Sequence, residues 1–208
     1  MGLTALLLVA AAPARRAAAE TTYYSTRSVL AEFFPNSERV TFRTYTVDAP
    51  LKGRLGQRLG CRSAQLKDRY TIFVATTKGK IDGYAVIDDE MGQHMPITFA
   101  TRLSSRGVVE RLEIMVYRES RGDEVRDARF RRQFEGKTAQ DPLRLNRDVD
   151  AVSGATISSA SMAVGVHRAA VLVEELAIGL GALASAPPSA APSAAAAHAP
   201  ANRNAAVR

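Results

Sequence analysis

Helical periodicity near the C-terminal end of the chain constrains its fold more than any other feature. Six apolar residues follow one another at spacings of four, three, four, three and four, which is the repeat of an α-helix with one buried face. This pattern predicts a helix from Ser158 to Leu180 that packs its apolar stripe against the rest of the domain. The stripe consists of Met162, Val166, Ala169, Val173, Leu176 and Leu180.

Four segments with strand character come before this helix. Short turns separate them, and Lys78-Gly79-Lys80 is suited to a tight hairpin between the first two. In the last segment Leu112, Ile114 and Val116 alternate with the residues between them, so one buried and one mixed face are expected. Consecutive strands joined by short turns predict an antiparallel meander. The segments are Tyr70–Thr76, Ile81–Asp88, Ile97–Ser104 and Val108–Tyr117.

Shorter elements are expected on either side of the meander. A helix from Thr26 to Phe34, a strand from Arg39 to Val47 and a helical segment opened by Asp48-Ala-Pro50 precede it. A helix from Glu124 to Phe134 follows it, and a polar connection from Lys137 to Val149 leads to the long helix. The predicted fold class is therefore α+β, with an antiparallel sheet flanked by helices.

The residues just before the long helix form the stretch Asp150-Ala-Val-Ser-Gly-Ala-Thr156. A hydroxyl at a helix start lies beside unpaired backbone N–H groups and the positive end of the helix dipole, which together favour a phosphate. Gly154 and Ala155 keep the approach to Thr156 free of bulk. The alternative interpretation is an ordinary turn in which Ser153 or Thr156 caps a helix.

This stretch resembles the attachment motif of the FMN-binding domain family. Members of that family include the flavin subunits of the sodium-pumping NADH:quinone reductase and of Rnf-type electron transport complexes, and the periplasmic part of nitrous oxide reductase regulators. The resemblance follows the family's order upstream and covers roughly Val74 to Leu176. The upstream matches are Gly83-Tyr-Ala-Val-Ile87, Pro96-Ile-Thr-Phe99, Val116-Tyr-Arg-Glu-Ser120 and Phe134-Glu-Gly-Lys137.

The resemblance implies a covalent cofactor at Thr156. In the family, a flavin transferase that uses FAD and Mg²⁺ moves FMN onto the final threonine of the motif as a phosphoester. Ser153 is then expected to orient the phosphate or the turn, with Gly154 and Ala155 beside it. Asp150 is expected to be recognised by the transferase. No catalytic residue and no metal site of the chain's own are expected.

The ring of such a flavin is expected over the loop that follows the last strand. Tyr117, Glu119, Arg121 and Gly122 are the candidate contacts there. The corresponding family stretch often reads Glu-Thr-Pro-Gly, of which only Glu119 and Gly122 match. A solvated charged turn is the alternative interpretation of Glu119 and Arg121.

Both ends of the chain differ in composition from the middle. Residues 1–19 contain an apolar run from Leu3 to Ala12 followed by Ala17-Ala18-Ala19, which fits a cleaved secretory signal, although no Lys or Arg precedes the run. An uncleaved membrane anchor is the alternative. Residues 182–208 are rich in Ala, Pro and Ser and read as a disordered tail. Residues 20–181 are left as the FMN-binding domain.

Composition excludes several other classes of function. Cys61 is the only cysteine, so an internal disulfide, a cysteine-ligated iron–sulfur cluster and a thiolate-rich metal site are excluded. The three histidines are far apart and have no metal-ligand spacing. The net charge is +7, but the basic residues are scattered among acidic ones, which argues against nucleic acid as a partner.

Three classes of function follow from the sequence. The favoured one is an exported, periplasmic or membrane-associated electron carrier that holds covalent FMN and has no substrate site of its own. Its partners are a flavin transferase and the membrane or periplasmic proteins that donate and accept electrons. The second is a regulatory or assembly module for another redox enzyme, and the third is a binding domain without redox activity.

The N-terminal segment gives a first testable prediction. If it is a cleaved secretory signal, exported protein begins at Glu20, and intact-mass analysis of the secreted material should detect that species. A full-length species that retains Met1 and stays in the cytosol would contradict the prediction.

Overall fold

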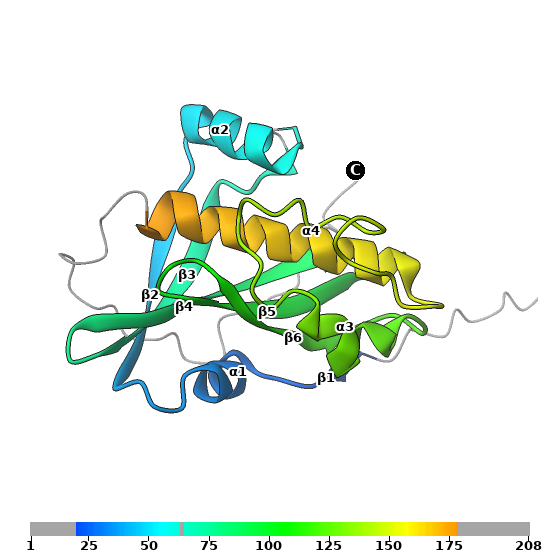
Figure 1. Cartoon of the computed structure of the whole chain (residues 1–208), viewed down its shortest axis with the longest axis horizontal. Helices are drawn as coiled ribbons and strands as arrows, with labels where there is room; N and C mark the ends of the chain where they lie inside the picture. The colour runs from blue at the N-terminus through cyan, green and yellow to red at the C-terminus, as the bar shows by residue number, and fades with distance from the viewer. Residues whose placement is uncertain (1–19, 63–64, 179–208) are drawn as a thin grey trace, which may run out of the picture.

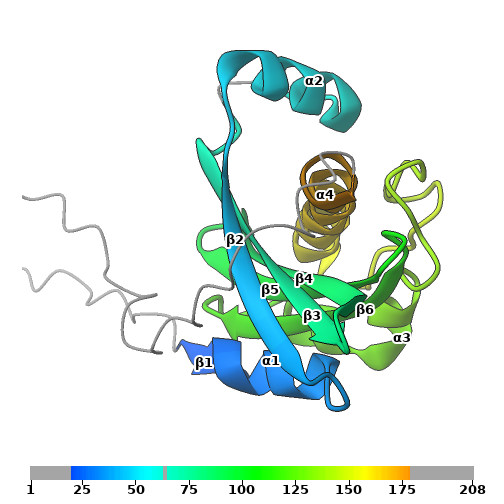
Figure 2. The same ribbon diagram turned by 90° about the vertical axis from the view of Figure 1, so that its left-hand side faces the viewer.

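A six-stranded antiparallel sheet forms the centre of the molecule and separates two layers of helices (Figures 1 and 2). The computed structural model describes residues 20–62 and 65–178, so the expected signal segment, tail and Leu180 lie outside the described residues. The strand order is β1-β6-β5-β4-β3-β2. The strands are β1 (Thr21–Thr22), β2 (Arg39–Thr46), β3 (Arg69–Thr77), β4 (Lys80–Met91), β5 (Pro96–Ser104) and β6 (Val109–Tyr117).

The meander from β3 to β6 confirms the α+β class predicted from the sequence. Each of these strands pairs antiparallel with the next one in the chain. Lys78 and Gly79 have φ angles of 50° and 74°, and two successive residues with positive φ are what a tight hairpin turn requires. The turn expected at Lys78-Gly79-Lys80 is therefore present between β3 and β4.

Helices cover the two faces of the sheet unequally. Figure 2 shows α4 (Thr156–Leu172) lying on one face with α2 (Ala49–Leu59) beyond it, and α1 (Thr26–Phe33) on the other face. The core under α4 is the larger and includes Phe99, Ile114 and Met162. The core under α1 contains Val29, Phe33 and residues from the opposite face of the sheet.

The long C-terminal helix has the buried stripe that its periodicity predicts. The stripe residues from Met162 to Leu176 are at most 1% exposed. The helix begins two residues earlier than expected, at Thr156, and its last described part is the π-helix η3 (Val173–Ile178). Among the described residues, Thr156–Ile178 is also the one helix long and apolar enough to cross a membrane, but 67% of its apolar window is buried inside the domain. Such burial is typical of a core helix.

A β-bulge in β6 corrects the strict alternation expected from the sequence. Thr98 pairs with Val116 and Phe99 pairs with Ile114, so Met115 is an extra residue on β6. After this point the faces are exchanged, because Val116 joins the core under α1 and Tyr117 joins the core under α4. The expectation that Val116 shares a face with Ile114 was wrong, and the bulge is what aims Tyr117 toward α4.

The single helix expected over Glu124–Phe134 is broken. The chain forms the 3₁₀ helix η2 (Asp123–Arg126) and the short α3 (Ala128–Arg132), with extended backbone at Asp127 (φ −54°, ψ 130°) between them. The Asp127 carboxylate accepts a hydrogen bond from the Arg129 N–H (2.6 Å), so this residue starts a new helix. The apolar positions Val125, Phe130 and Phe134 are nonetheless buried, as their spacing suggests.

Gly165 sets how closely α4 approaches the sheet. A Cβ atom at this position would lie 2.4 Å from the Cζ atom of Phe99, whose side chain is fully buried in β5. The ring has little room to move away from such a contact. A residue without a side chain is therefore required where the helix crosses β5.

Substituting two helical glycines should separate this packing effect from helix propensity. Gly53→Ala in α2 meets no atom within 4 Å, so it should stabilise the fold by about 1 kcal/mol and raise the thermal midpoint by about 2–4 °C. Gly165→Ala has the same gain in propensity but overpacks Phe99 at a cost of about 1–3 kcal/mol, so its midpoint should be unchanged or lower. Calorimetry of both variants checks this, and equal stabilisation of the two would contradict the close approach.

Candidate functional site

Thr156 is the first residue of α4 and its side chain is exposed. The preceding residue, Ala155, has backbone angles outside the helical region (φ −124°, ψ 31°) and makes no side-chain capping hydrogen bond. The N–H groups of the first turn are therefore not capped by the residue before the helix. This arrangement favours an anion at Thr156 and disfavours the alternative in which Ser153 or Thr156 caps the helix.

A tight turn brings the chain to Thr156. The Ala155 N–H donates to the Val152 carbonyl (3.0 Å), and Gly154 has a φ of +83°, which residues with a side chain rarely adopt. Ser153 and Gly154 are exposed, whereas the methyl group of Ala155 is 2% exposed and packs in the core. Ala155 therefore anchors the turn, and Gly154 allows it to close.

Two side chains hold the loop before the turn. The side-chain amide of Gln133 pairs with the main chain of Asp150: Gln133 Oε1 accepts from the Asp150 N–H (2.7 Å), and Gln133 Nε2 donates to the Asp150 carbonyl (3.2 Å). The buried Ser159 Oγ accepts from the Val152 N–H (3.1 Å). The Asp150 side chain itself remains exposed. Sequence analysis did not identify Gln133 or Ser159, because the sequence does not indicate which main-chain groups these side chains will bind.

The loop after β6 is fastened to the first turn of α4. The Tyr117 hydroxyl donates its one proton to the Arg121 carbonyl (2.6 Å). In the contact between Tyr117 and Ser158 (3.0 Å), Ser158 Oγ is therefore the donor. Gly122 has a φ of +92°, and a Cβ there would lie 2.6 Å from the Tyr117 hydroxyl and 2.7 Å from Ser158 Oγ. The loop after β6 and the attachment motif, which the sequence predicted as two parts of one site, are therefore held together by Tyr117, Gly122 and Ser158.

The phenol of Tyr117 is kept neutral by its surroundings. Burial raises the pKa of Tyr117 above its ordinary value, the hydrogen bond from Ser158 opposes this, and the nearby carboxylates of Glu119, Asp123 and Glu124 raise the pKa further. A neutral phenol retains the proton that it donates to Arg121. The role observed for Tyr117 is thus to position the loop.

Glu119 holds the turn between β4 and β5. Its Oε1 atom accepts hydrogen bonds from the N–H groups of His94 (2.9 Å) and Met95 (3.3 Å). The turn is closed by the Gly92 N–H, which donates to the Met95 carbonyl (2.9 Å). Glu119 thus connects the loop after β6 to a turn that sequence analysis did not associate with the site, whereas Arg121 has an exposed side chain.

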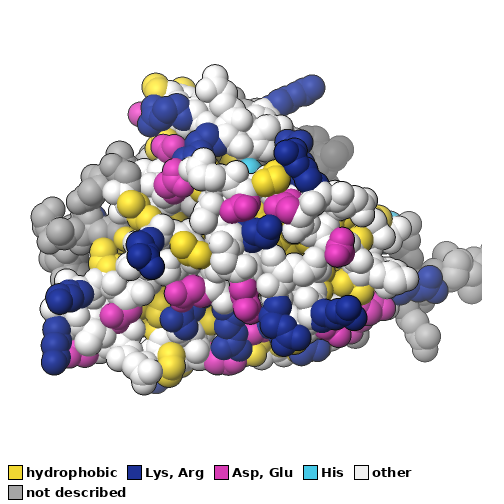
Figure 3. Space-filling model, in the orientation of Figure 1, with side chains coloured by type: hydrophobic (Ala, Val, Ile, Leu, Met, Phe, Trp, Pro, Cys, Tyr) yellow, Lys and Arg dark blue, Asp and Glu magenta, His cyan; other side chains and the backbone are white. Residues whose placement is uncertain are grey.

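The surface on the Asp150 side of the motif is acidic. A groove of about 540 Å³ there is lined by residues of η2, α3 and the motif, three of which are carboxylates. On the face shown in Figure 3, acidic and basic side chains are interspersed, as the sequence suggested. In the part of the chain that the structure describes, no group of three or more His, Cys, Asp or Glu side chains is placed to hold a metal ion. The groove residues are Glu124, Asp127, Arg129, Phe130, Gln133, Asp150, Ala151 and Val152.

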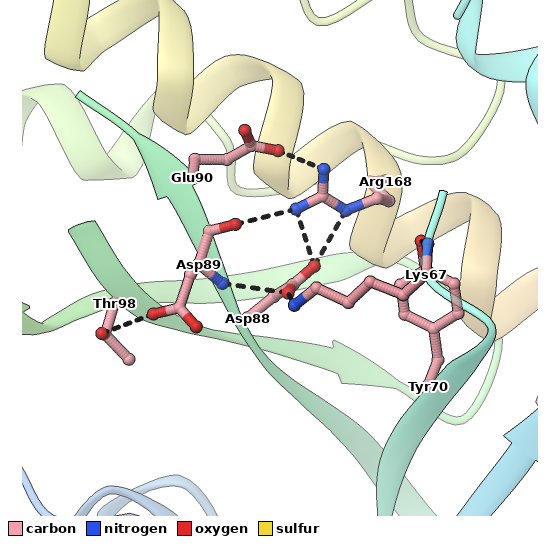
Figure 4. Close-up of polar contacts among 7 residues, drawn as sticks. All are labelled: Lys67, Tyr70, Asp88, Asp89, Glu90, Thr98 and Arg168. Atoms are coloured by element: carbon pink, nitrogen blue, oxygen red, sulfur yellow. Dashed lines mark hydrogen bonds and ion pairs between the residues drawn. The ribbon is translucent and has the colours of Figure 1, made fainter. Parts of the chain in front are cut away.

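A buried ion-pair cluster fixes α4 against β4 (Figure 4). Arg168 Nη2 lies 2.7 Å from Asp88 Oδ2, its Nη1 pairs with Glu90, and Lys67 also pairs with Asp88. Burial lowers the pKa of Arg168, but the carboxylates of Asp88 and Glu90 more than offset this and raise it above its ordinary value. Two cations face two carboxylates, so the cluster is balanced in charge and its role is to hold the helix.

A second pocket, whose lining includes Val164, lies further along α4 than Thr156. It has a volume of about 570 Å³ and lies between α2, the connection at residues 139–144 and the middle of α4. Cys61 lines it and is partly buried against the core. His167 also lines it, and burial lowers the pKa of that imidazole.

Comparison with known proteins assigns the family. The FMN-binding domain family matches residues 66–171. Two similar solved structures are NqrC of Shewanella oneidensis (16% identity, 65% of this chain and 79% of that chain covered, TM-score 0.46) and a subunit of the Na⁺-translocating NADH-quinone reductase of Parabacteroides distasonis (19% identity, 68% and 83% covered, TM-score 0.40). No curated protein sequence matches this chain.

The fold and the site define an α+β domain that presents an exposed threonine at the start of a core helix. The chain belongs to the FMN-binding domain family, whose match covers half of it. FMN is accordingly the cofactor of this domain.

A matched pair of glycine variants should reveal the fastening between the two loops. Gly122 and Gly136 both have positive φ (92° and 80°), so alanine costs about 1–2 kcal/mol at either position. A Cβ at Gly136 meets no atom within 4 Å, whereas at Gly122 it collides with Tyr117 and Ser158. Gly122→Ala should therefore lower the thermal midpoint clearly more than Gly136→Ala. An equal decrease in the thermal midpoint of the two variants would mean that the contact of Gly122 with Tyr117 and Ser158 contributes nothing to stability.

Proposed function

We propose that this protein is an electron carrier that holds FMN through a phosphoester with the hydroxyl of Thr156. The observation that carries the proposal is the exposed Thr156 hydroxyl at the first position of a 17-residue helix, without a side-chain cap, in a motif that matches the family's attachment site. The dipole of such a helix and its free N–H groups favour the charge of the phosphate. Bound FMN supplies one- and two-electron redox chemistry.

The surroundings of Thr156 support a covalent link over reversible binding. Carboxylates of Glu124 and Asp150 lie beside the motif and repel a free phosphate, while the helix start offers only partial positive charge. A single covalent bond retains the flavin where these groups alone would hold it weakly.

The attachment reaction requires a partner enzyme. In the proposed reaction the Thr156 oxygen attacks the FMN phosphorus of FAD, an O–P bond forms, the pyrophosphate bond breaks, and AMP leaves while the hydroxyl proton is released. A flavin transferase with Mg²⁺ supplies the catalytic groups. Asp150 is exposed beside the motif and available for the transferase to bind, and Ser153 and Gly154 are exposed on the same turn.

The remaining site residues act by positioning in this proposal. Ala155 anchors the turn, Tyr117 fastens the loop after β6, and Glu119 holds the β4–β5 turn. The carrier works outside the cytoplasm and exchanges electrons with membrane or periplasmic redox proteins. The second candidate function is a flavin-dependent regulatory or assembly module, which predicts bound flavin but unchanged electron flux when the gene is deleted.

Substitution at Thr156 tests the attachment. Co-expression with an active flavin transferase and Mg²⁺ should give wild-type protein whose flavin fluorescence survives denaturing electrophoresis. Thr156→Val keeps the shape but removes the oxygen nucleophile, so its band should be dark. Thr156→Ser should retain partial labelling, and Ser153→Ala should be close to wild type.

Two outcomes would contradict the proposal. A fluorescent Thr156→Val band would mean that the flavin is attached elsewhere. A dark wild-type band, with the transferase active on a known acceptor, would mean that this chain does not accept FMN covalently.

A further inference from the structure

Exposed apolar side chains gather beside Thr156. Five large apolar residues in the described part of the chain are exposed, and four of them lie on the first half of α4, at the end of β4 or in the adjacent β4–β5 turn. These four, which we name the α4 apolar strip, are Met91 (57% exposed), Met95 (42%), Ile157 (50%) and Val164 (55%). Single exposed apolar residues are common, but a group of four at one place indicates something that covers them.

The side chain of Ser161 joins the two parts of the strip. Its hydroxyl shares its one proton between the Met91 carbonyl (2.5 Å) and the Ile157 carbonyl (3.0 Å), so the end of β4 lies against the first turns of α4. Glu119 holds the same turn through the N–H of Met95. The methionines and the helix therefore form one surface.

Helix geometry aligns this surface with Thr156. Thr156, Ala160 and Val164 are four residues apart, which places them on the same side of α4 over about 12 Å of helix axis. Ala160 is exposed and its side chain is small, so the surface is depressed between Ile157 and Val164. In Figure 1, α2 lies over the C-terminal half of α4 and does not extend over its N-terminal half, beside which the connection from α3 runs.

We propose that the isoalloxazine ring of the flavin attached to Thr156 lies on the α4 apolar strip. This inference rests on the proposed function. A phosphate and a five-carbon ribityl chain span about 8–10 Å when extended, which reaches the strip from Thr156. The ring is flat with an apolar dimethylbenzene edge, and methionine thioethers make favourable contacts with aromatic rings. Met91 and Met95 are flexible enough to close over one edge of it.

Attachment makes a shallow surface sufficient for the ring. A tethered group has an effective concentration in the millimolar range, so weak apolar contacts hold it in place for most of the time. A ring on the strip keeps one face toward solvent, where a redox partner can approach it.

Oxidation of methionine tests where the ring lies without measuring activity. Flavin-loaded wild type, wild type made without the transferase, and Thr156→Val would be treated with hydrogen peroxide in the dark, and oxidised peptides quantified by mass spectrometry. Met91 and Met95 should oxidise several-fold more slowly in the loaded protein than in both flavin-free samples. Buried Met115 and Met162, which are 3% and 0% exposed, should be slow in all three samples and serve as internal controls.

A charge placed on the strip gives a second readout. Val164→Glu should lower the fluorescence anisotropy of the folded, loaded protein, because the ring then moves freely, while the flavin per protein after denaturation stays unchanged. Ala31→Glu places the same charge on an exposed position of α1, on the opposite face of the sheet, and should leave the anisotropy unchanged.

The outcomes separate this inference from the proposed function. Covalent flavin with equally oxidised methionines, or with unchanged anisotropy in Val164→Glu, would overturn only the placement of the ring. A wild type without covalent flavin would overturn both proposals. A dimer of the flavin-free protein that Val164→Glu abolishes, measured by light scattering, would assign the strip to a second copy and overturn the placement.

Discussion

The ion pairs of Arg168 with Asp88 and Glu90 are the interaction on which the rest of the site depends. An apolar stripe attaches α4 to the sheet but fixes its rotation and its position along its axis only loosely, because neighbouring apolar residues can replace one another in the core. An ion pair is more specific, because it forms only where its two charged groups face each other. Arg168 is 14% exposed and Asp88 is 4% exposed, and removing Arg168 would leave the carboxylates of Asp88 and Glu90 with Lys67 as the one cation of the cluster, at a cost of about 3–5 kcal/mol. The pairs therefore fix which side of the helix faces solvent, and Thr156 and the strip lie on that side.

The same helix is fixed at its start by contacts with loops from distant parts of the chain. The bulge in β6 turns Tyr117 toward α4, where its hydroxyl meets Ser158. Gly122 provides the space for that contact, and Glu119 extends it to the β4–β5 turn. An irregular strand, a glycine and three polar side chains thus hold the motif turn, Thr156 and the β4–β5 turn in one fixed arrangement.

The sequence predicted those features that depend on local pattern. The strands, the Lys78-Gly79 turn and the long helix follow from periodicity and turn chemistry, and the motif follows from seven adjacent residues. The bulge at Met115 and the break at Asp127 could not be predicted. The spacing of apolar residues in the sequence is the same for a regular strand or helix as for one interrupted at a single residue. The partners of Gln133 and Arg168 depend on which strands and loops meet in space, and single-sequence reasoning has no signal for that.

A covalent tether changes what the protein must provide for its cofactor. A domain that binds a flavin reversibly needs a deep pocket and basic groups for the phosphate, both of which restrict access to the ring. A tethered flavin needs only one reactive oxygen at an accessible turn and a surface against which the ring can rest. The geometry is compatible with the second case: Thr156 is exposed at a helix start, four exposed apolar side chains lie near it, and the ion pairs that order the helix lie further along it at Arg168. In the proposed function, electron exchange would take place at the first turns of α4, whereas the ion pairs that stabilise the helix lie further along it, so an accessible ring would not weaken the fold.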